Sequence, residues 1–158
     1  MAVPFAACMA LVASLYHLPP RVLPSIMRVE GGRPGLARLN TDGTRDLGLM
    51  QVNTRWLPAL ARYTRLSEPD VERSLLTRSC FNIAAGGLIL RTYLDEARGE
   101  MMQAIGYYHS HTKPLGDAYQ EQVIAAARSL FTGPGAPVVQ QGFHPTLMSR
   151  AAASEQLR

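Results

Sequence analysis

The side chain best placed to do chemistry is Glu30, a carboxyl group at the end of an apolar stretch. Apolar residues recur at three-residue steps from Leu23 to Val29, which predicts a helix with one apolar face. Gly31 and Gly32 follow and end that helix. A carboxyl group at such a junction is partly desolvated, which raises its pKa and keeps it protonated near neutral pH. Glu30 therefore suits a general acid, although a solvated glutamate near a helix end has the same sequence signature.

The segment after Glu30, residues 31–53, is the longest stretch without helical periodicity. It contains five glycines, and Asn40-Thr41-Asp42-Gly43 predicts a tight turn. The segment ends with Gly48-Leu49-Met50-Gln51-Val52-Asn53. Long loops within compact domains usually carry function. We therefore expect a functional loop here, with room for a short β-hairpin.

Helices are expected to hold this loop and Glu30 in place. Residues 5–16 are apolar almost all round, which predicts a buried helix. A second helix is predicted from the Pro19-Pro20 turn to Glu30. Further helices are predicted from Asn53 or Thr54, from Ser67, and over residues 80–97, 100–109 and 116–131, with Pro114 and Gly116 separating the last two. Two glycines inside the 80–97 helix, Gly86 and Gly87, indicate close approach to another helix, so the sequence predicts a mainly α domain.

Length and composition fit one domain followed by a tail. The chain has 158 residues, of which 47% are hydrophobic and 18% charged, as is typical of a globular protein rather than a disordered one. After Phe131 the composition shifts to Gly133-Pro134-Gly135 and then to Gln, Pro and Ser. We therefore expect a domain over residues 1–131 and a Gly/Pro-rich C-terminal tail over residues 132–158.

The charge pattern bears on partners. The net charge is +4, from 16 Lys and Arg and 12 Asp and Glu, and Lys113 is the one lysine among these basic residues. No basic run or interleaved aromatic stripe accompanies this balance, so the sequence does not indicate nucleic-acid binding. No apolar run reaches the roughly 18 residues that a membrane-spanning helix requires.

Two cysteines, Cys8 and Cys80, leave two interpretations open. A disulfide between them would imply an oxidising compartment, whereas two buried free thiols fit the sequence equally well. The first 16 residues are apolar but contain no Lys or Arg, so they lack the charged start of a secretory signal. An exported domain whose signal was removed and a cytoplasmic protein both fit.

Four sequence blocks occur in order along the chain. They are Glu30; Gly48-Leu49-Met50-Gln51-Val52-Asn53; Asn82-Ile83-x-x-Gly86; and Ala104-Ile105-x-x-Tyr108-His109-Ser110, with Tyr119 beyond them. Together they resemble the soluble lytic transglycosylase family, which has a lysozyme-like fold. The branch they resemble comprises the small enzymes that accompany secretion, conjugation and pilus systems. The resemblance covers roughly residues 6–131.

The resemblance implies roles for specific residues. Glu30 matches the single catalytic acid/base of the family. The positions implied to bind substrate are Gly48, Leu49, Met50, Gln51, Asn53, Asn82, Tyr108 and Tyr119. The branch also has cysteines at the positions of Cys8 and Cys80, which favours a disulfide over free thiols. A disulfide and a cell-wall substrate imply a periplasmic protein whose export signal, absent from this chain, has been removed.

The partners implied by the resemblance are peptidoglycan glycan strands and, with them, proteins of a secretion or conjugation machine. No cofactor is expected, and we expect a monomer. His109 and His111 lie two apart without a third ligand, so no metal site is expected. Two positions depart from the family pattern: Gly31 replaces the usual Ser after the catalytic Glu, and His109-Ser110-His111 replaces Asn-Ala-Gly.

The family chemistry uses one carboxyl group twice. Protonated Glu30 would donate to the β-1,4 oxygen between N-acetylmuramic acid and N-acetylglucosamine, and the 2-acetamido group would stabilise the cationic centre. Glu30 would then take the proton of the C6 hydroxyl, closing a 1,6-anhydro ring without water. Ordinary glycosidases use two carboxylates about 5 to 9.5 Å apart. Asp42 and Asp46 are the nearby candidates, but we expect Asp42 to hold a turn and Asp46 to cap the loop.

Several side chains are predicted to line a sugar cleft around Glu30. Gln51 and Asn53 offer amides that orient polar groups, and Met50 would supply an apolar wall. Tyr108 is expected either to hydrogen-bond Glu30 or to stack on a sugar, whereas Tyr107 is expected in the core and Trp56 in the core beside the cleft.

Two other functions remain open. A hydrolytic muramidase on the same scaffold would leave reducing ends instead of anhydro ends. A non-catalytic peptidoglycan-binding assembly factor is supported by the missing Ser at Gly31 and by the Pro-rich tail. The retained Glu30 argues against such a factor, because binding alone needs no desolvated carboxyl group.

Overall fold

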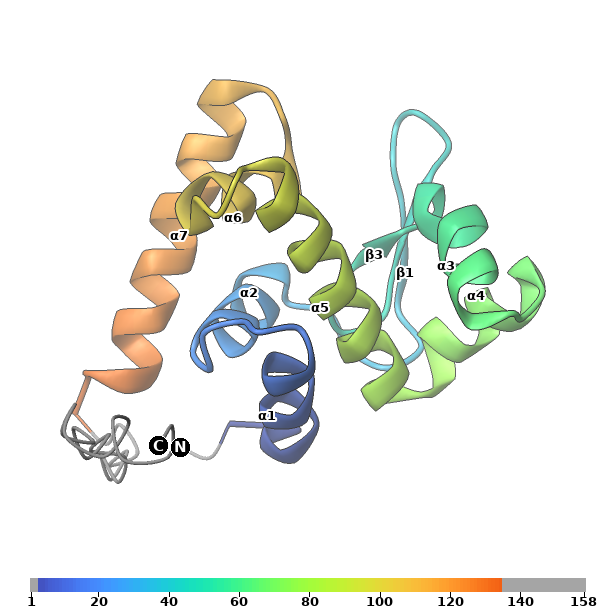
Figure 1. Cartoon of the computed structure of the whole chain (residues 1–158), viewed down its shortest axis with the longest axis horizontal. Coiled ribbons are helices and arrows are strands. Elements are labelled where there is room, and N and C mark those ends of the chain that lie inside the picture. Colours follow the sequence, from blue (N-terminus) through green and yellow to red (C-terminus); the bar gives the residue numbers. More distant parts are fainter. Residues whose placement is uncertain (1–2, 135–158) are drawn as a thin grey trace, which may run out of the picture.

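The computed structural model describes residues 3–134 and contains helices with one small sheet (Figure 1). In chain order the elements are α1 (Ala6–Leu15), α2 (Val22–Glu30), β1 (Ala37–Leu39), β2 (Arg45–Leu47), β3 (Val52–Asn53), the 3₁₀ helix η1 (Thr54–Trp56), α3 (Leu57–Thr64), α4 (Glu68–Thr77), α5 (Ser79–Glu96), α6 (Met101–His109) and α7 (Lys113–Phe131). The predicted mainly α, lysozyme-like fold is confirmed.

Helix α5 forms the centre of the domain. It packs against α1, α4 and α6, and in Figure 1 it runs diagonally between the helices α1, α2, α6 and α7 on one side and the sheet with α3 and α4 on the other. Ile83 and Leu90 of α5 are fully buried together with Leu23 and Ile26 of α2. Burying apolar side chains of this size stabilises the fold by about 1.5–3 kcal/mol each.

The two glycines inside α5 permit close packing, as the sequence indicates. A Cβ on Gly87 would lie 2.3 Å from Val12 Cγ1 of α1, which is closer than any real contact. A Cβ on Gly86 would lie 3.0 Å from the Met50 side chain. The first glycine therefore permits a helix–helix contact, and the second lets α5 approach the loop that ends in Asn53.

The segment after Glu30 is more ordered than a loop with one hairpin. Its three short strands form an antiparallel sheet in the order β1-β2-β3, with Leu39 opposite Arg45 and Leu47 opposite Val52. Asn53 then caps η1 by accepting a hydrogen bond from the Arg55 backbone N–H at 2.9 Å. This cap confirms the predicted helix start at Asn53.

The prediction that Pro114 and Gly116 separate the last two helices is wrong. Helix α7 begins at Lys113, so Pro114 lies in its first turn, where no helical hydrogen bond needs its missing N–H. Gly116 lies inside α7, where a Cβ would be 3.0 Å from the backbone oxygen of Ser110. This glycine therefore serves close packing against the end of α6 rather than a turn.

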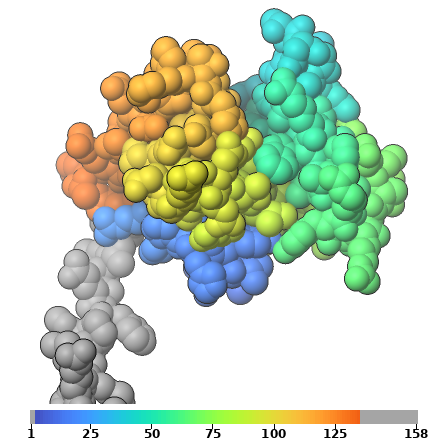
Figure 2. Space-filling model, turned by 45° about the horizontal axis from the view of Figure 1, so that its top comes forward, coloured from blue at the N-terminus to red at the C-terminus, as the bar shows by residue number. Residues whose placement is uncertain are grey.

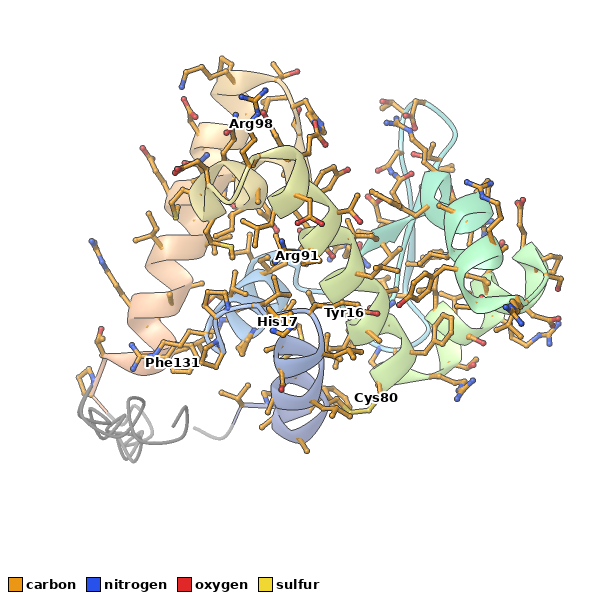
Figure 3. All side chains as sticks on the ribbon, viewed as in Figure 1. Tyr16, His17, Cys80, Arg91, Arg98 and Phe131 are labelled. Carbon is orange, nitrogen blue, oxygen red and sulfur yellow. A yellow bond between two sulfur atoms is a disulfide. The ribbon has the colours of Figure 1, made fainter. Side chains whose placement is uncertain are left out.

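A disulfide links α1 to the start of α5. Cys8 and Cys80 are bonded and their Cα atoms lie 5.6 Å apart, across a sequence separation of 72 residues; the bond is the yellow one at Cys80 in Figure 3. This is the pairing that the resemblance implied. Most of the predicted tail, residues 135–158, lies outside the described residues. Among the described helices, none has the length and apolarity to cross a membrane.

Candidate active site

Glu30 is the last residue of α2, and local contacts fix the end of this helix. Gly31 adopts a left-handed conformation with φ of 60°, and its N–H donates to the Met27 carbonyl at 3.2 Å. The Arg38 guanidinium of β1 donates to the backbone carbonyls of Glu30 and Gly31 at 3.1 and 3.3 Å. A cation at a helix C-terminus is favourable because the last carbonyls carry partial negative charge.

The Glu30 carboxyl group is half-buried and its pKa is raised to about 7, chiefly because burial disfavours the charged form. The Tyr119 O–H of α7 donates a hydrogen bond to Glu30 Oε1, which lowers this pKa and partly offsets the effect of burial. The charge of Asp46 raises the pKa of Glu30 and that of Arg38 lowers it. The carboxyl group is thus divided between its two protonation states near neutral pH, as an acid that later acts as a base requires.

Tyr119 is buried, with 4% of its surface exposed, and it remains a hydrogen-bond donor. Burial and the neighbouring Glu30 raise the pKa of its hydroxyl far above the usual range. The ring of His109 stacks on that of Tyr119, with centroids 5.0 Å apart and planes inclined by 6°. Because Tyr119 occupies Oε1, Oε2 of Glu30 is the oxygen left to carry a transferable proton.

Glu30 opens into a cleft of about 730 Å³. One wall comes from the β-sheet segment and η1, and the other from α5 and the α6–α7 connection. Figure 2 shows the surface hollowed between the cyan segment that carries the sheet and the orange segment that carries the start of α7. A cleft of this size, lined mostly by polar side chains with Glu30 among them, fits an extended polar ligand.

Asn82 of α5 fixes the Gly-Leu-Met-Gln segment from beneath. Its Oδ1 accepts from the Met50 N–H at 2.8 Å, and its Nδ2 donates to the carbonyls of Leu47 and Leu75 at 2.8 and 2.9 Å. The Tyr108 O–H of α6 donates to the Met50 carbonyl at 3.0 Å. These bonds satisfy the backbone N–H and carbonyl of Met50, which lies in a turn, and tie this turn through Asn82 to β2 and α4.

Glycines allow the same segment to lie against the chain after Glu30. A Cβ on Gly32 would lie 2.1 Å from the Gly48 carbonyl oxygen, and one on Gly48 would lie 2.3 Å from Asn82 Nδ2. Gly48 also has a φ of 70°, which other residues rarely adopt. The close contacts of Gly32 with Gly48, and of Gly48 with Asn82, therefore position Glu30 beside the cleft floor.

Seven of the eight predicted substrate-binding residues form two groups, and the eighth, Tyr119, bonds the Glu30 carboxyl group. Gln51, Asn53 and Tyr108 line the cleft with Glu30. Gly48, Leu49, Met50 and Asn82 are buried beneath it. Met50 has no exposed surface, so the expectation that its side chain forms a wall of the cleft is wrong; it packs on Gly86 instead.

The structure also reassigns the two tyrosines. The hydrogen bond to Glu30 comes from Tyr119, whereas the Tyr108 hydroxyl bonds the Met50 carbonyl. Both side chains come from elements far along the chain, and the packing of α7 against α2 and α6 decides which hydroxyl reaches the carboxyl group. Tyr108 still lines the cleft.

The two aspartates have different surroundings. Asp42 accepts bonds from the backbone and side chain of Thr44 and pairs with Arg55, which holds its pKa at about 2 and confirms its role in the turn. Asp46 lines the cleft and accepts from Asn40 Nδ2 at 3.0 Å and Asn53 Nδ2 at 2.8 Å. Asp46 thus faces the same cavity as Glu30.

Aromatic residues line both walls of the cleft, with Trp56 on the η1 side and Tyr93 and Tyr107 on the α5 and α6 side. Trp56 meets Tyr93 edge-on at 5.6 Å, and Tyr107 stacks on His111 at 4.2 Å. Tyr107 lines the cleft in addition to contacting the core, which corrects its assignment to the core alone. Sequence analysis missed Tyr93, because an aromatic residue at helical spacing in α5 is indistinguishable from a core residue.

His109 packs on Tyr119, and His111 has a hydrogen-bonding partner. His111 Nε2 lies 2.8 Å from Glu96 Oε1. Within residues 3–134, no group of three His, Cys, Asp or Glu side chains is arranged to hold a metal ion.

Comparison with known proteins identifies the family. The model of the transglycosylase SLT domain matches residues 8–130, which is most of the chain. The chain belongs to this SLT family. It is also similar to the invasion protein IagB of two strains of Salmonella typhimurium and of Salmonella typhi, with 29% identity over 112 residues. The match covers 70% of this chain and 66% of each relative, slightly less than two thirds of their length.

Gly31 departs from the family pattern, but it suits the backbone conformation at the end of α2. The left-handed conformation at φ of 60° is one that glycine adopts at little cost. A Cβ at Gly31 would approach only Arg38, at 3.9 Å, so space is not what excludes a side chain. The position favours glycine through its backbone rather than through packing.

Proposed function

We propose that this SLT domain is a peptidoglycan lytic transglycosylase in which Glu30 acts first as acid and then as base. It cleaves the β-1,4 bond between N-acetylmuramic acid and N-acetylglucosamine and leaves a 1,6-anhydromuramoyl end. The single observation that carries the proposal is the half-buried Glu30 at the base of the cleft, with its pKa raised to about 7 and Tyr119 bonded to Oε1. Membership of the SLT family supports the substrate class.

The geometry supports a division of labour within Glu30. Oε2 donates its proton to the glycosidic oxygen, and the leaving sugar departs as an alcohol. Tyr119 then stabilises the carboxylate through Oε1, which keeps the base available until it accepts the proton of the C6 hydroxyl. No second protein carboxylate is required, because the substrate's own acetamido group stabilises the cationic sugar.

The polar residues of the cleft position the sugars. Gln51 and Asn53 line the cleft with amides that bonds to the Gly48 carbonyl and to Asp46 hold in place, and Tyr108 lies beside them. The aromatic wall around Tyr93 and Trp56 offers apolar faces on which sugar rings stack. A glycan strand therefore runs between the sheet segment and the α5–α6 wall.

A hydrolytic muramidase is a second candidate, and Asp46 favours it. This carboxylate lines the same cavity as Glu30 and is oriented by two amides, from Asn40 and Asn53. Such a group can stabilise or trap a cationic sugar while water attacks. The two candidates differ in product and in their dependence on Asp46.

We also propose that the protein acts in the periplasm and opens the wall locally for a secretion, conjugation or pilus apparatus. The name of the similar Salmonella proteins links those proteins to invasion, which supports an association with a surface machine. The disulfide between Cys8 and Cys80 supports an oxidising compartment.

The test compares wild type and Glu30→Gln on isolated peptidoglycan, with the released muropeptides analysed by mass spectrometry. The variant keeps the side-chain shape but removes the transferable proton. Anhydro products from wild type and none from Glu30→Gln are expected. Products heavier by one water would instead establish the muramidase, and Asp46→Asn would then abolish them.

Absence of product from the wild type, with binding to the wall intact, would overturn both enzymatic functions. It would leave the third function considered, a wall-binding assembly factor.

A further inference from the structure

A second cavity of about 420 Å³ lies between α6 and α7. It adjoins the main cleft, because Tyr107, Ser110 and His111 line both. None of its lining residues is Glu30 or Tyr119. The second cavity is therefore a side branch of the cleft rather than part of the acid/base centre.

Two glycines shape this branch. A Cβ on Gly106 would lie 2.8 Å from Gln120 Nε2, and a Cβ on Gly116 would lie 3.4 Å from the Gly106 Cα. The backbones of the two helices therefore approach closely at these glycines, and the Gln120 amide lies against Gly106.

The polar groups around the second cavity are of mixed type. Gln103 Nε2 donates to the Tyr107 hydroxyl at 2.6 Å, and the Gln120 amide lies over Gly106. Lys113 Nζ donates to Asp117 Oδ2 at 2.7 Å. An ammonium group has three donors and a carboxylate has two oxygens, so both members of this pair retain capacity for a ligand.

This set of groups suits a short peptide better than another sugar. Side-chain amides pair with peptide N–H and C=O groups, the ammonium with a carboxylate, and the aspartate with an amine. In peptidoglycan, a peptide with carboxylates and amines branches from the muramoyl sugar. A glycan lying in the cleft must therefore place such branches somewhere, and the side branch opens beside it.

We propose that the second cavity binds the first residues of the peptide carried by the muramoyl sugar, and so makes the protein selective for peptide-bearing glycan. The proposal rests on the peptidoglycan function proposed above. Gln120 and the Lys113–Asp117 pair are the specificity-determining residues.

The test measures kcat/KM on two forms of the same glycan, one with its peptides and one from which an amidase has removed them. Wild type is expected to prefer the peptide-bearing form. Gln120→Ala and the double variant Lys113→Met, Asp117→Asn are expected to lower that preference by about fivefold or more. Gln122→Ala, an exposed glutamine of the same helix that lies outside the second cavity, is the matched control and should keep the wild-type ratio.

A second measurement separates this inference from the catalytic proposal. Binding of the N-acetylglucosaminyl-N-acetylmuramic acid disaccharide, with and without its peptide, is measured with Glu30→Gln by calorimetry. Tighter binding of the peptide form, reduced by Gln120→Ala, supports the second cavity even if the wild type shows no cleavage. Equal affinity for the two forms, or a wild-type preference that the cavity variants keep, overturns the inference while leaving the catalytic role of Glu30 untouched.

Discussion

Two carboxyl groups of the same cleft, Glu30 and Asp42, show how surroundings decide chemical role. Glu30 ends α2, which packs against α7, and desolvation by burial raises the pKa of its carboxyl group to about 7. Asp42 sits in an exposed turn, where bonds from Thr44 and then the Arg55 guanidinium hold its pKa at about 2. The first group exchanges protons at neutral pH and the second stays charged. Only the first is suited to general acid–base work.

Asp46 occupies an intermediate position between these two. It lines the cleft like Glu30, but two amide donors bind it, much as Thr44 binds Asp42. Its negative charge contributes to the raised pKa of Glu30. Asp46 therefore raises the pKa of Glu30 through its charge, and in the proposed function it takes a direct part only if water is the acceptor.

The largest expected effect comes from replacing each of these two carboxyl groups, Glu30 and Asp42, by its amide. Glu30→Gln should lower the rate of glycan cleavage by about 10³-fold, because acid–base catalysis contributes roughly 10²–10⁴. Asp42→Asn should stay within about threefold of wild type, since it changes an exposed turn. Initial rates of muropeptide release measure both. A fall in rate in Asp42→Asn equal to that in Glu30→Gln would contradict the different roles assigned to the two carboxyl groups.

The second effect concerns stability. A folded-state pKa of about 7 means that Glu30 stabilises the fold fully below about pH 4.5 and progressively less as the pH rises through 7. Wild type loses this stabilisation as the pH rises, whereas Glu30→Gln does not. The free energy of unfolding of Glu30→Gln minus that of wild type should therefore increase by about 3 kcal/mol between pH 4 and pH 8. Urea unfolding at the two pH values tests this. A difference that is constant with pH would contradict burial of the carboxyl group.

Two further variants should move the pKa of Glu30 in opposite directions. Tyr119→Phe removes a hydrogen bond that favours the carboxylate, so the alkaline limb of the rate profile should shift upward and kcat should fall about tenfold. Asp46→Asn removes a repelling charge, so the limb should shift downward. The pH dependence of kcat measures both, and shifts of equal sign would refute the assigned interactions.

The smallest expected effect is at Asp42. Because its pKa is held at about 2, its contribution to stability is present above about pH 4 and is lost as the pH falls through 2. Asp42→Asn should therefore melt at a slightly lower temperature than wild type at pH 7 and at the same temperature near pH 2. Calorimetric scans at both pH values compare the two proteins. A larger deficit at low pH would show that the turn bonds do not depend on the charge.

Much of the scaffold was predictable because local signals specify it. The apolar steps before Glu30, the caps at Asn53 and Ser67, and the glycines of α5 each act within a few residues. The ends of α7 were harder, because Pro114 marks a helix start as readily as a break. The choice depended on how closely Gly116 approaches α6.

The site was predictable only in part, because residues that contact one another in it lie far apart in the sequence. The family blocks identified Glu30, but its partner Tyr119 is 89 residues away. Likewise, Asn82 and Met50 belong to conspicuous motifs yet lie beneath the cleft, where they hold its floor. A motif shows that residues act together without showing which of them face the ligand.

The proposed acid/base role of Glu30 requires its carboxyl group to titrate near neutral pH inside the cleft. The most direct measurement is a carbon-13 NMR titration of the glutamate side-chain carboxyl groups, with Glu30→Gln identifying the Glu30 signal. We expect a pKa of about 7 for that signal, lowered in Asp46→Asn and raised in Tyr119→Phe. A midpoint near 4.5, the ordinary value for a glutamate, would contradict it.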